Sequence, residues 1–225
     1  MLGLGYANIT GAKAASGGVG DGTVVGLYHF ESPVIADSKL DSSGYNNTLV
    51  AYSYSVVSAS AYGMTGDYCG STFSNIRHTN TVIADGDSYT VEALIYTSAR
   101  ASIDSLPIGS GQYAVSVGFG VNTTDLSSSD TTIFVNYIAY DLTIAPDYSV
   151  PTLATITVPT VANTLFNVKI VYTNKTVKVY LNGELKAFIN NNNANWSSVP
   201  QVGNFVCEIN AGGTVRVDEF KITKN

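Results

Sequence analysis

The residues that could do chemistry in this chain are aromatic and amide side chains rather than nucleophiles. Trp196 and Asn195 lie in an asparagine-rich loop, and Tyr52 and Tyr54 stand two residues apart. On one continuous strand, residues two apart share a face, so both tyrosines would present their rings together. Such rings stack on pyranose rings while amides bind hydroxyl groups, so these four residues are candidate carbohydrate ligands. The alternative is structural: Tyr52 belongs to the core, and Trp196 covers a sheet edge or a subunit interface.

Catalytic groups are sparse. The only candidate bases, His29 and His78, have no Gly-x-Ser-x-Gly elbow beside them. A glycosidase on a β-sandwich would place carboxylates at alternate positions of one strand, and no such run occurs. Glu92 stands alone on its strand, while Asp218 and Glu219 are adjacent and are expected to face opposite ways. The sequence therefore predicts a protein that is not an enzyme.

The composition is poor in charge and rich in tyrosine, glycine and small polar residues. Charged residues make up 12% of the 225 residues, against about 25% in an average globular domain. The formal net charge is −6, and the lysines and arginines are scattered. Nucleic acid is not an expected partner, because its binding needs a concentrated basic patch. A polar but uncharged surface is typical of extracellular β-proteins and of virion proteins.

The first 22 residues contain seven glycines and little apolar periodicity. They lack the basic and apolar regions of a signal peptide, and no apolar run approaches the ~20 residues that span a bilayer. We expect no signal peptide and no membrane insertion. Residues 1–22 are either a disordered leader or an arm that orders against a neighbouring subunit, and we favour the arm. The rest, 23–225, is expected to be one domain.

The two cysteines are Cys69 and Cys207. They could form one disulfide in an oxidising compartment or remain two buried thiols. We favour buried thiols, because a core of this size does not need a covalent link.

Short apolar-alternating segments recur along the chain and indicate strands. The clearest run, Phe166–Ile189, reads as three strands with a type I′ turn at Asn182-Gly183. The other expected strands are Thr23–Glu31, Thr48–Ser58, Tyr68–Phe73, Tyr89–Thr97, Tyr113–Val121, Thr131–Ala139, Thr155–Val158, Val202–Asn210 and Thr214–Thr223. Regular strand spacing with minimal helix predicts an antiparallel sandwich or jelly roll.

Several segments, in this order along the chain, resemble the laminin G-like, concanavalin A-like jelly-roll family. They are Gly26–Glu31 (GLYHFE), Asp41–Asn47 (DSSGYNN), Tyr89–Tyr96 (YTVEALIY), the Lys178–Ala187 hairpin and Val217–Ile222 (VDEFKI). The resemblance implies an all-β jelly-roll sandwich that binds sugars, proteins or steroids, or that builds a surface.

The resemblance also implies a structural calcium ion, with Asp41, Asn46 and Asp218 as the matching ligands. Calcium accepts carboxylate and amide oxygens from loops, and the first and last strands of a closed jelly roll are neighbours. Alternatively, Asp41 and Asn46 satisfy their own turn through hydrogen bonds to the backbone. No other cofactor is expected.

The resemblance, together with the missing signal peptide and the N-terminal arm, implies a non-catalytic structural or adhesion protein that is displayed on a bacteriophage head or tail and assembles through its arm. Its expected partners are sibling subunits, other virion proteins and host-surface glycans. The main alternative is a stand-alone carbohydrate-binding module, in which Trp196 would carry the affinity.

Overall fold

The computed structural model describes residues 22–80, 82–83, 87–97, 101–107, 112–121, 131–140, 152–158, 164–173, 176–190, 205–211 and 214–225. The strands in these residues are β1 (Thr23–Tyr28), β2 (Val50–Ala51), β3 (Tyr54–Ser58), β4 (Tyr68–Thr72), β5 (Asn75–Asn80), β6 (Tyr89–Thr97), β7 (Ala101–Pro107), β8 (Gln112–Val121), β9 (Thr131–Tyr140), β10 (Thr152–Val158), β11 (Thr164–Thr173), β12 (Thr176–Leu181), β13 (Glu184–Asn190), β14 (Phe205–Ala211) and β15 (Val215–Lys224).

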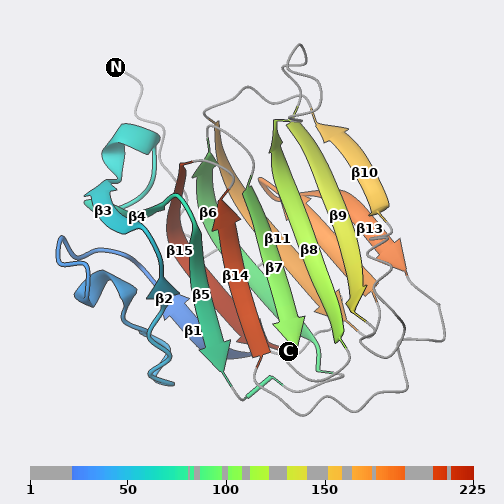
Figure 1. The fold of residues 1–225 in the computed structure, drawn as a ribbon, viewed down its shortest axis with the longest axis horizontal. Helices are drawn as coiled ribbons and strands as arrows, with labels where there is room; N and C mark the ends of the chain where they lie inside the picture. The colour runs from blue at the N-terminus through green and yellow to red at the C-terminus, as the bar shows by residue number, and fades with distance from the viewer. Residues whose placement is uncertain are drawn as a thin grey trace.

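The strands form two layers (Figure 1). Sheet A has the order β13-β12-β11-β6-β15-β4-β3, and β1 also pairs with β15. Sheet B has the order β10-β9-β8-β7-β14-β5-β2. The strand pairings are antiparallel, so the predicted all-β antiparallel jelly-roll sandwich is confirmed.

The strands of sheet A form as the alternation predicts. In β12 the side chains of Val177, Val179 and Leu181 are buried, and the residues between them are partly exposed. The turn to β13 has positive φ at Asn182 (51°) and Gly183 (84°), which confirms the type I′ turn.

One hydrophobic core fills the space between the sheets. Its largest fully buried side chains are Tyr28, Phe30, Leu49, Ile76, Ile95, Ile103, Ile209, Phe220 and Ile222. We call the side of sheet A that faces away from this core its outer face.

The prediction of a single strand over Thr48–Ser58 is wrong. The segment divides into β2 in sheet B and β3 in sheet A, with Tyr52 and Ser53 between them. Ser53 has a φ of 49°, a conformation that ends the strand. The neighbouring chain, from β4 to β5, changes sheet in the same way at Phe73, so two strands turn one corner together.

The helical segments of the described residues are two 3-10 turns, η1 (Asp37–Lys39) and η2 (Ser60–Tyr62). In this part of the chain, no helix has the length and apolar character needed to cross a bilayer. Cys69 in β4 and Cys207 in β14 are buried thiols, as expected. The proposed N-terminal arm, 1–22, lies outside the described residues except for Gly22.

Candidate functional site

The outer face of sheet A carries a continuous line of side chains that runs across six strands. The antiparallel register places each one directly opposite the next. This cross-strand row consists of Leu185 (β13), Tyr180 (β12), Lys169 (β11), Glu92 (β6), Lys221 (β15) and Leu27 (β1). Facing side chains on adjacent strands lie about 4.5–5.5 Å apart at Cβ, so the row is a connected surface.

Glu92 is the electrostatic centre of the row. Lys169 Nζ lies 3.2 Å from Glu92 Oε1, and Lys221 Nζ lies 3.5 Å from Oε2. The three side chains are 44%, 31% and 38% exposed for Lys169, Glu92 and Lys221, respectively. The carboxylate therefore holds two ammonium groups in place at a surface open to solvent.

A shallow depression of about 70 Å³ lies at the centre of this face. It is lined by Leu27, Glu92, Ala93, Leu94, Asn167, Glu219 and Lys221. At about 10–15 Å³ of such space per water molecule, it has room for a few water-sized groups. The depression can therefore accept hydroxyl groups of a ligand lying on the surface. Its lining combines aliphatic side chains with carboxylate, amide and ammonium groups.

The other half of the outer face is covered. Residues 59–67, which we call the covering segment, pack Ala59 and Met64 against Cys69 of β4. Partly buried Val57, Tyr62, Tyr96 and Leu165 complete this second, smaller core. We call this the covered half, and we call the part around the cross-strand row the open half.

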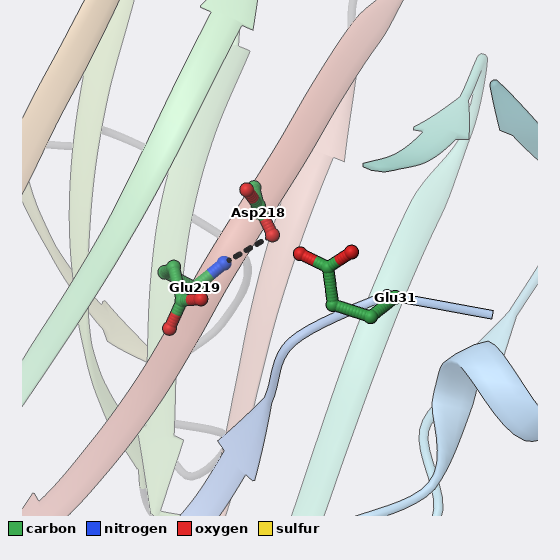
Figure 2. Close-up of side chains that lie close together, drawn as sticks. All are labelled: Glu31, Asp218 and Glu219. Atoms are coloured by element: carbon green, nitrogen blue, oxygen red, sulfur yellow. Dashed lines mark hydrogen bonds between the residues drawn. The ribbon is translucent and has the colours of Figure 1, made fainter. Parts of the chain in front are cut away.

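A carboxylate cluster stands at the boundary between the halves. The ligand atoms of Glu31, Asp218 and Glu219 all lie within 4.8 Å of one another (Figure 2). The expectation that Asp218 and Glu219 face opposite ways is wrong. A shift of register between Asp218 and Lys221, with a φ of 48° at Glu219, interrupts the alternation.

Asp218 is fully buried beneath the covering segment. Its carboxylate accepts hydrogen bonds from the Glu219 backbone N–H (2.9 Å) and the Thr65 hydroxyl (3.1 Å). Burial raises the pKa of Asp218 to about 7, and the nearby Glu219 and Glu31 carboxylates add to this effect, against the hydrogen bonds. Asp218 is thus a costly anion in the folded protein.

This cluster fits calcium chemically. Calcium binds oxygen at about 2.3–2.6 Å, so opposite ligand atoms are at most about 5 Å apart. Glu31, Asp218 and Glu219 satisfy that limit. If calcium binds, these three residues would hold it, and its charge would offset the repulsion between the carboxylates.

Asp41 and Asn46, the other two predicted ligands, are placed differently. The Asp41 carboxylate accepts hydrogen bonds from the backbone N–H of Leu27, Ser43 and Asn47 and from the Ser43 hydroxyl, at 2.8–3.0 Å. These bonds lower the pKa of Asp41 despite the opposing effect of burial. Asn46 is exposed, with a φ of 57°. Asp41 therefore fastens its own loop to β1, as the alternative interpretation holds.

The predicted sugar-binding residues are not brought together in the described residues. Tyr52 is 57% exposed at the corner between the sheets. Tyr54 is half-buried, and its hydroxyl lies 2.9 Å from Ser38 Oγ; burial raises its pKa to about 12. Trp196 and Asn195 lie outside the residues that the structure describes.

The sequence patterns do not identify the open half as a binding surface. The register between Lys169 and Tyr180 is local and follows from neighbouring strands in the predicted triple. The pairing of Glu92 with Lys169 and Lys221 joins segments far apart in the chain. The one signal in the sequence is that Glu92 is the only charged residue of its strand.

Comparison with solved structures shows the same fold. Domain 4 of AbnA, a GH43 extracellular arabinanase from Geobacillus stearothermophilus solved with arabinotriose, is 14% identical; the match covers 91% of this chain and 93% of that one, with a TM-score of 0.52. The binding domain of botulinum neurotoxin DC, solved with rat synaptotagmin II, is 15% identical, with 89% and 48% covered and a TM-score of 0.51. This chain thus spans about half of the toxin chain.

The CBM2 module of the evolved Dit protein from Lactobacillus casei BL23 phage J-1 is 9% identical, with 90% and 95% covered and a TM-score of 0.49. No family model matches the sequence, and no curated protein matches it. At such identities the likeness concerns the fold.

Proposed function

We propose that this chain is a non-catalytic carbohydrate-binding module and that its ligand lies on the open half of sheet A. The observation that carries the proposal is the depression beside Glu92. There, carboxylate, amide and ammonium groups surround an aliphatic surface, which is the combination that a sugar requires. Sugar hydroxyls both donate and accept hydrogen bonds, while the C–H face of a sugar ring is apolar.

The charged groups around the depression are paired with one another in the absence of a ligand. Glu92 is held by the two lysines opposite it, and Glu219 Oε2 lies 3.0 Å from His29 Nδ1. The exposed Asn167 side chain adds an amide donor and acceptor at the rim. Preorganised polar groups lose less entropy on binding, which matters for the weak affinities expected of an exposed site.

The arabinanase domain supports this proposal, because a jelly roll of the same overall shape was solved there with arabinotriose. The likeness does not say which surface or which sugar is used here. For that reason the proposal rests on the residues of the open half.

Catalysis is not part of the proposal, although the cluster at Asp218 and Glu219 pairs a raised pKa with a second carboxylate, as glycosidases do. A general acid must reach the glycosidic oxygen, and Asp218 has no exposed surface. Incubation with the bound oligosaccharides should release no reducing ends. Hydrolysis that disappears in Glu219→Gln would contradict the non-catalytic part of the proposal.

We also propose that this protein is displayed on a phage virion. Such a location is supported by the uncharged polar composition and would make glycan binding a means of host attachment. Mass spectrometry of purified phage particles, with copy number measured against the major capsid protein, would test it.

The binding proposal is tested by titration calorimetry against neutral oligosaccharides. The wild type should bind at least one of them, and Asn167→Ala should weaken binding several-fold without changing the melting temperature. The control is Asn47→Ala, which should lower stability but leave affinity intact, because Asn47 hydrogen-bonds Val25 of β1 away from the depression. No binding across the panel would overturn the proposal.

A further inference from the structure

We propose that the ligand is a neutral, linear oligosaccharide that lies across the strands, and that Tyr180, Leu185 and Phe188 form a second, apolar subsite at its far end. This inference rests on the proposed function and extends it to the class and orientation of the ligand. It follows from the register, charge and exposure of the open half.

The length of the ligand follows from the register. The cross-strand row joins Leu185 on β13 to Leu27 on β1 without a break. At about 4.8 Å between neighbouring strands, the row is about 24 Å long, which matches roughly four or five linked pyranose rings. The residues that line the depression belong to β1, β6, β11 and β15, so a ligand that also reaches β12 and β13 must lie along the surface.

The neutrality of the ligand follows from the balance of charge. Two carboxylates, Glu92 and Glu219, and two ammonium groups, Lys169 and Lys221, lie at the centre of the open half. Their formal charges cancel, and the whole chain has a net charge of −6. A polyanionic glycan would therefore meet repulsion over long range, against which Lys178 on β12 provides one further cation on this face.

The apolar subsite lies on the last two strands of the sheet. Leu185 is 52% exposed and stands opposite Tyr180, while Phe188 is 55% exposed and stands opposite Lys178. The Lys178 ammonium lies 5.8 Å from the centre of the Phe188 ring. These side chains add exposed apolar surface at one end of the cross-strand row, and an aromatic ring beside a cation suits a sugar ring with its hydroxyl groups.

The test is the dependence of affinity on ligand length. Calorimetry would use neutral xylo-, cello- and arabino-oligosaccharides of two to six units, with oligogalacturonates as the acidic comparison. For the sugar that binds, affinity should rise up to about four or five units, and acidic oligomers should bind more weakly. Phe188→Ala should weaken the pentasaccharide about tenfold, which corresponds to the loss of one aromatic contact, and should leave the disaccharide unchanged.

The matched control is Phe73→Ala, because Phe73 is 63% exposed but lies at the corner between the sheets. Leu185→Ser provides a second variant of the apolar subsite. Equal affinity for oligosaccharides of two and five units would overturn this inference and leave the proposed function intact. The same conclusion would follow if neither Phe188→Ala nor Leu185→Ser changed the affinity. Absence of any binding would overturn both. Self-association that is lost in Phe188→Ala, without a length effect, would assign the patch to a subunit contact and also overturn the inference.

Discussion

The outer face of sheet A is divided into a covered half and an open half, although the same strands run through both. β15 shows the contrast within four residues: Asp218 is fully buried, whereas the Lys221 side chain is 38% exposed at the edge of the depression. Strict alternation would place residues three apart on opposite faces, and the bulge at Glu219 brings both onto this face. Which of them meets solvent depends on the covering segment.

The boundary between the halves coincides with a change of partner along β15. Val215–Val217 pair with β4, and Phe220–Lys224 pair with β1, with Glu219 between them. The bulge brings Asp218 and Glu219 to the edge of the covering segment. The Thr65 hydroxyl of that segment donates to Asp218, and the backbone N–H of Asp67 donates to Glu31, which follows β1. One half of the face thus contributes stability, while the other is left free to bind a ligand.

The largest effect is expected from Met64→Ala, which removes a buried side chain from the covered half. The free energy of unfolding should fall by about 2–4 kcal/mol. Glycan affinity at the open half should stay within about twofold, because distant sites act independently. Chemical denaturation and calorimetry measure the two quantities, with Val34→Ala, an exposed position, as the control. A tenfold loss of affinity in a folded Met64→Ala protein would show that the halves are coupled.

Glu92→Gln, in the open half, is expected to lower glycan affinity and to leave stability nearly unchanged. The substitution releases Lys169 and Lys221 and removes a charged acceptor, so affinity should fall about tenfold, or about 1.4 kcal/mol. Stability should change by less than about 1 kcal/mol, because exposed ion pairs contribute little. Asp87→Asn is the control, since Asp87 also pairs with a lysine, Lys224, outside the depression. Equal affinity losses in both variants would show that Glu92 is not part of the binding site.

A smaller effect is expected from Gly66→Ala, which loosens the covering segment. Gly66 has a φ of 70°, and a methyl group would lie 1.6 Å from Glu31 Oε1, so the Glu31 carboxylate must move. Gly63 has the same φ, but its methyl group would meet only Leu165 Cδ2 at 4.0 Å. Both variants should lose about 1 kcal/mol through backbone strain, and Gly66→Ala should lose more. Equal losses, measured by thermal unfolding, would show that the contact with Glu31 is unimportant.

The smallest effect concerns the dependence of stability on pH. Between pH 3.8 and about 7, residue 218 loses its proton in the unfolded chain but keeps it in the folded protein. Asp218 therefore lowers stability as the pH rises through this window. His78, whose pKa is lowered to about 4 by burial, acts in the opposite direction below pH 6.5. The difference between wild type and Asp218→Asn isolates the first effect.

In EDTA, the stability of wild type relative to Asp218→Asn should decline from pH 4 to pH 8. A difference that does not change with pH would contradict the account of Asp218. At pH 8, millimolar calcium should raise the melting temperature of the wild type and leave the variant unchanged. If calcium does not change the melting temperature of the wild type, the cluster does not bind this ion.

Much of the fold could be predicted from the sequence because alternation and turn chemistry are local. The turn at Asn182-Gly183 is an example. The prediction omits β5 and β7. In β5, Ile76 is the only apolar residue, and the next inward position is the polar His78, which is buried with Nδ1 2.6 Å from the Tyr28 hydroxyl. The corner at Ser53 was missed because serine rarely adopts a positive φ.

The candidate site could be predicted far less well. Glu92 comes into contact with Lys169 and Lys221 through pairings between strands distant in sequence. No glycine or asparagine marks the bulge at Glu219 in the sequence, so strict alternation predicts opposite faces for Asp218 and Glu219. A site assembled from many strands depends on register, and register between distant strands is set by the packed core.

The most direct test of the account is to map the ligand on the protein by amide chemical-shift changes during titration with the tightest-binding oligosaccharide. The account predicts the largest changes at Glu92, Asn167 and Lys221, with smaller changes at Phe188 and none across the covering segment. Changes confined to the corner at Tyr52 and Phe73, or no saturable changes at all, would contradict it.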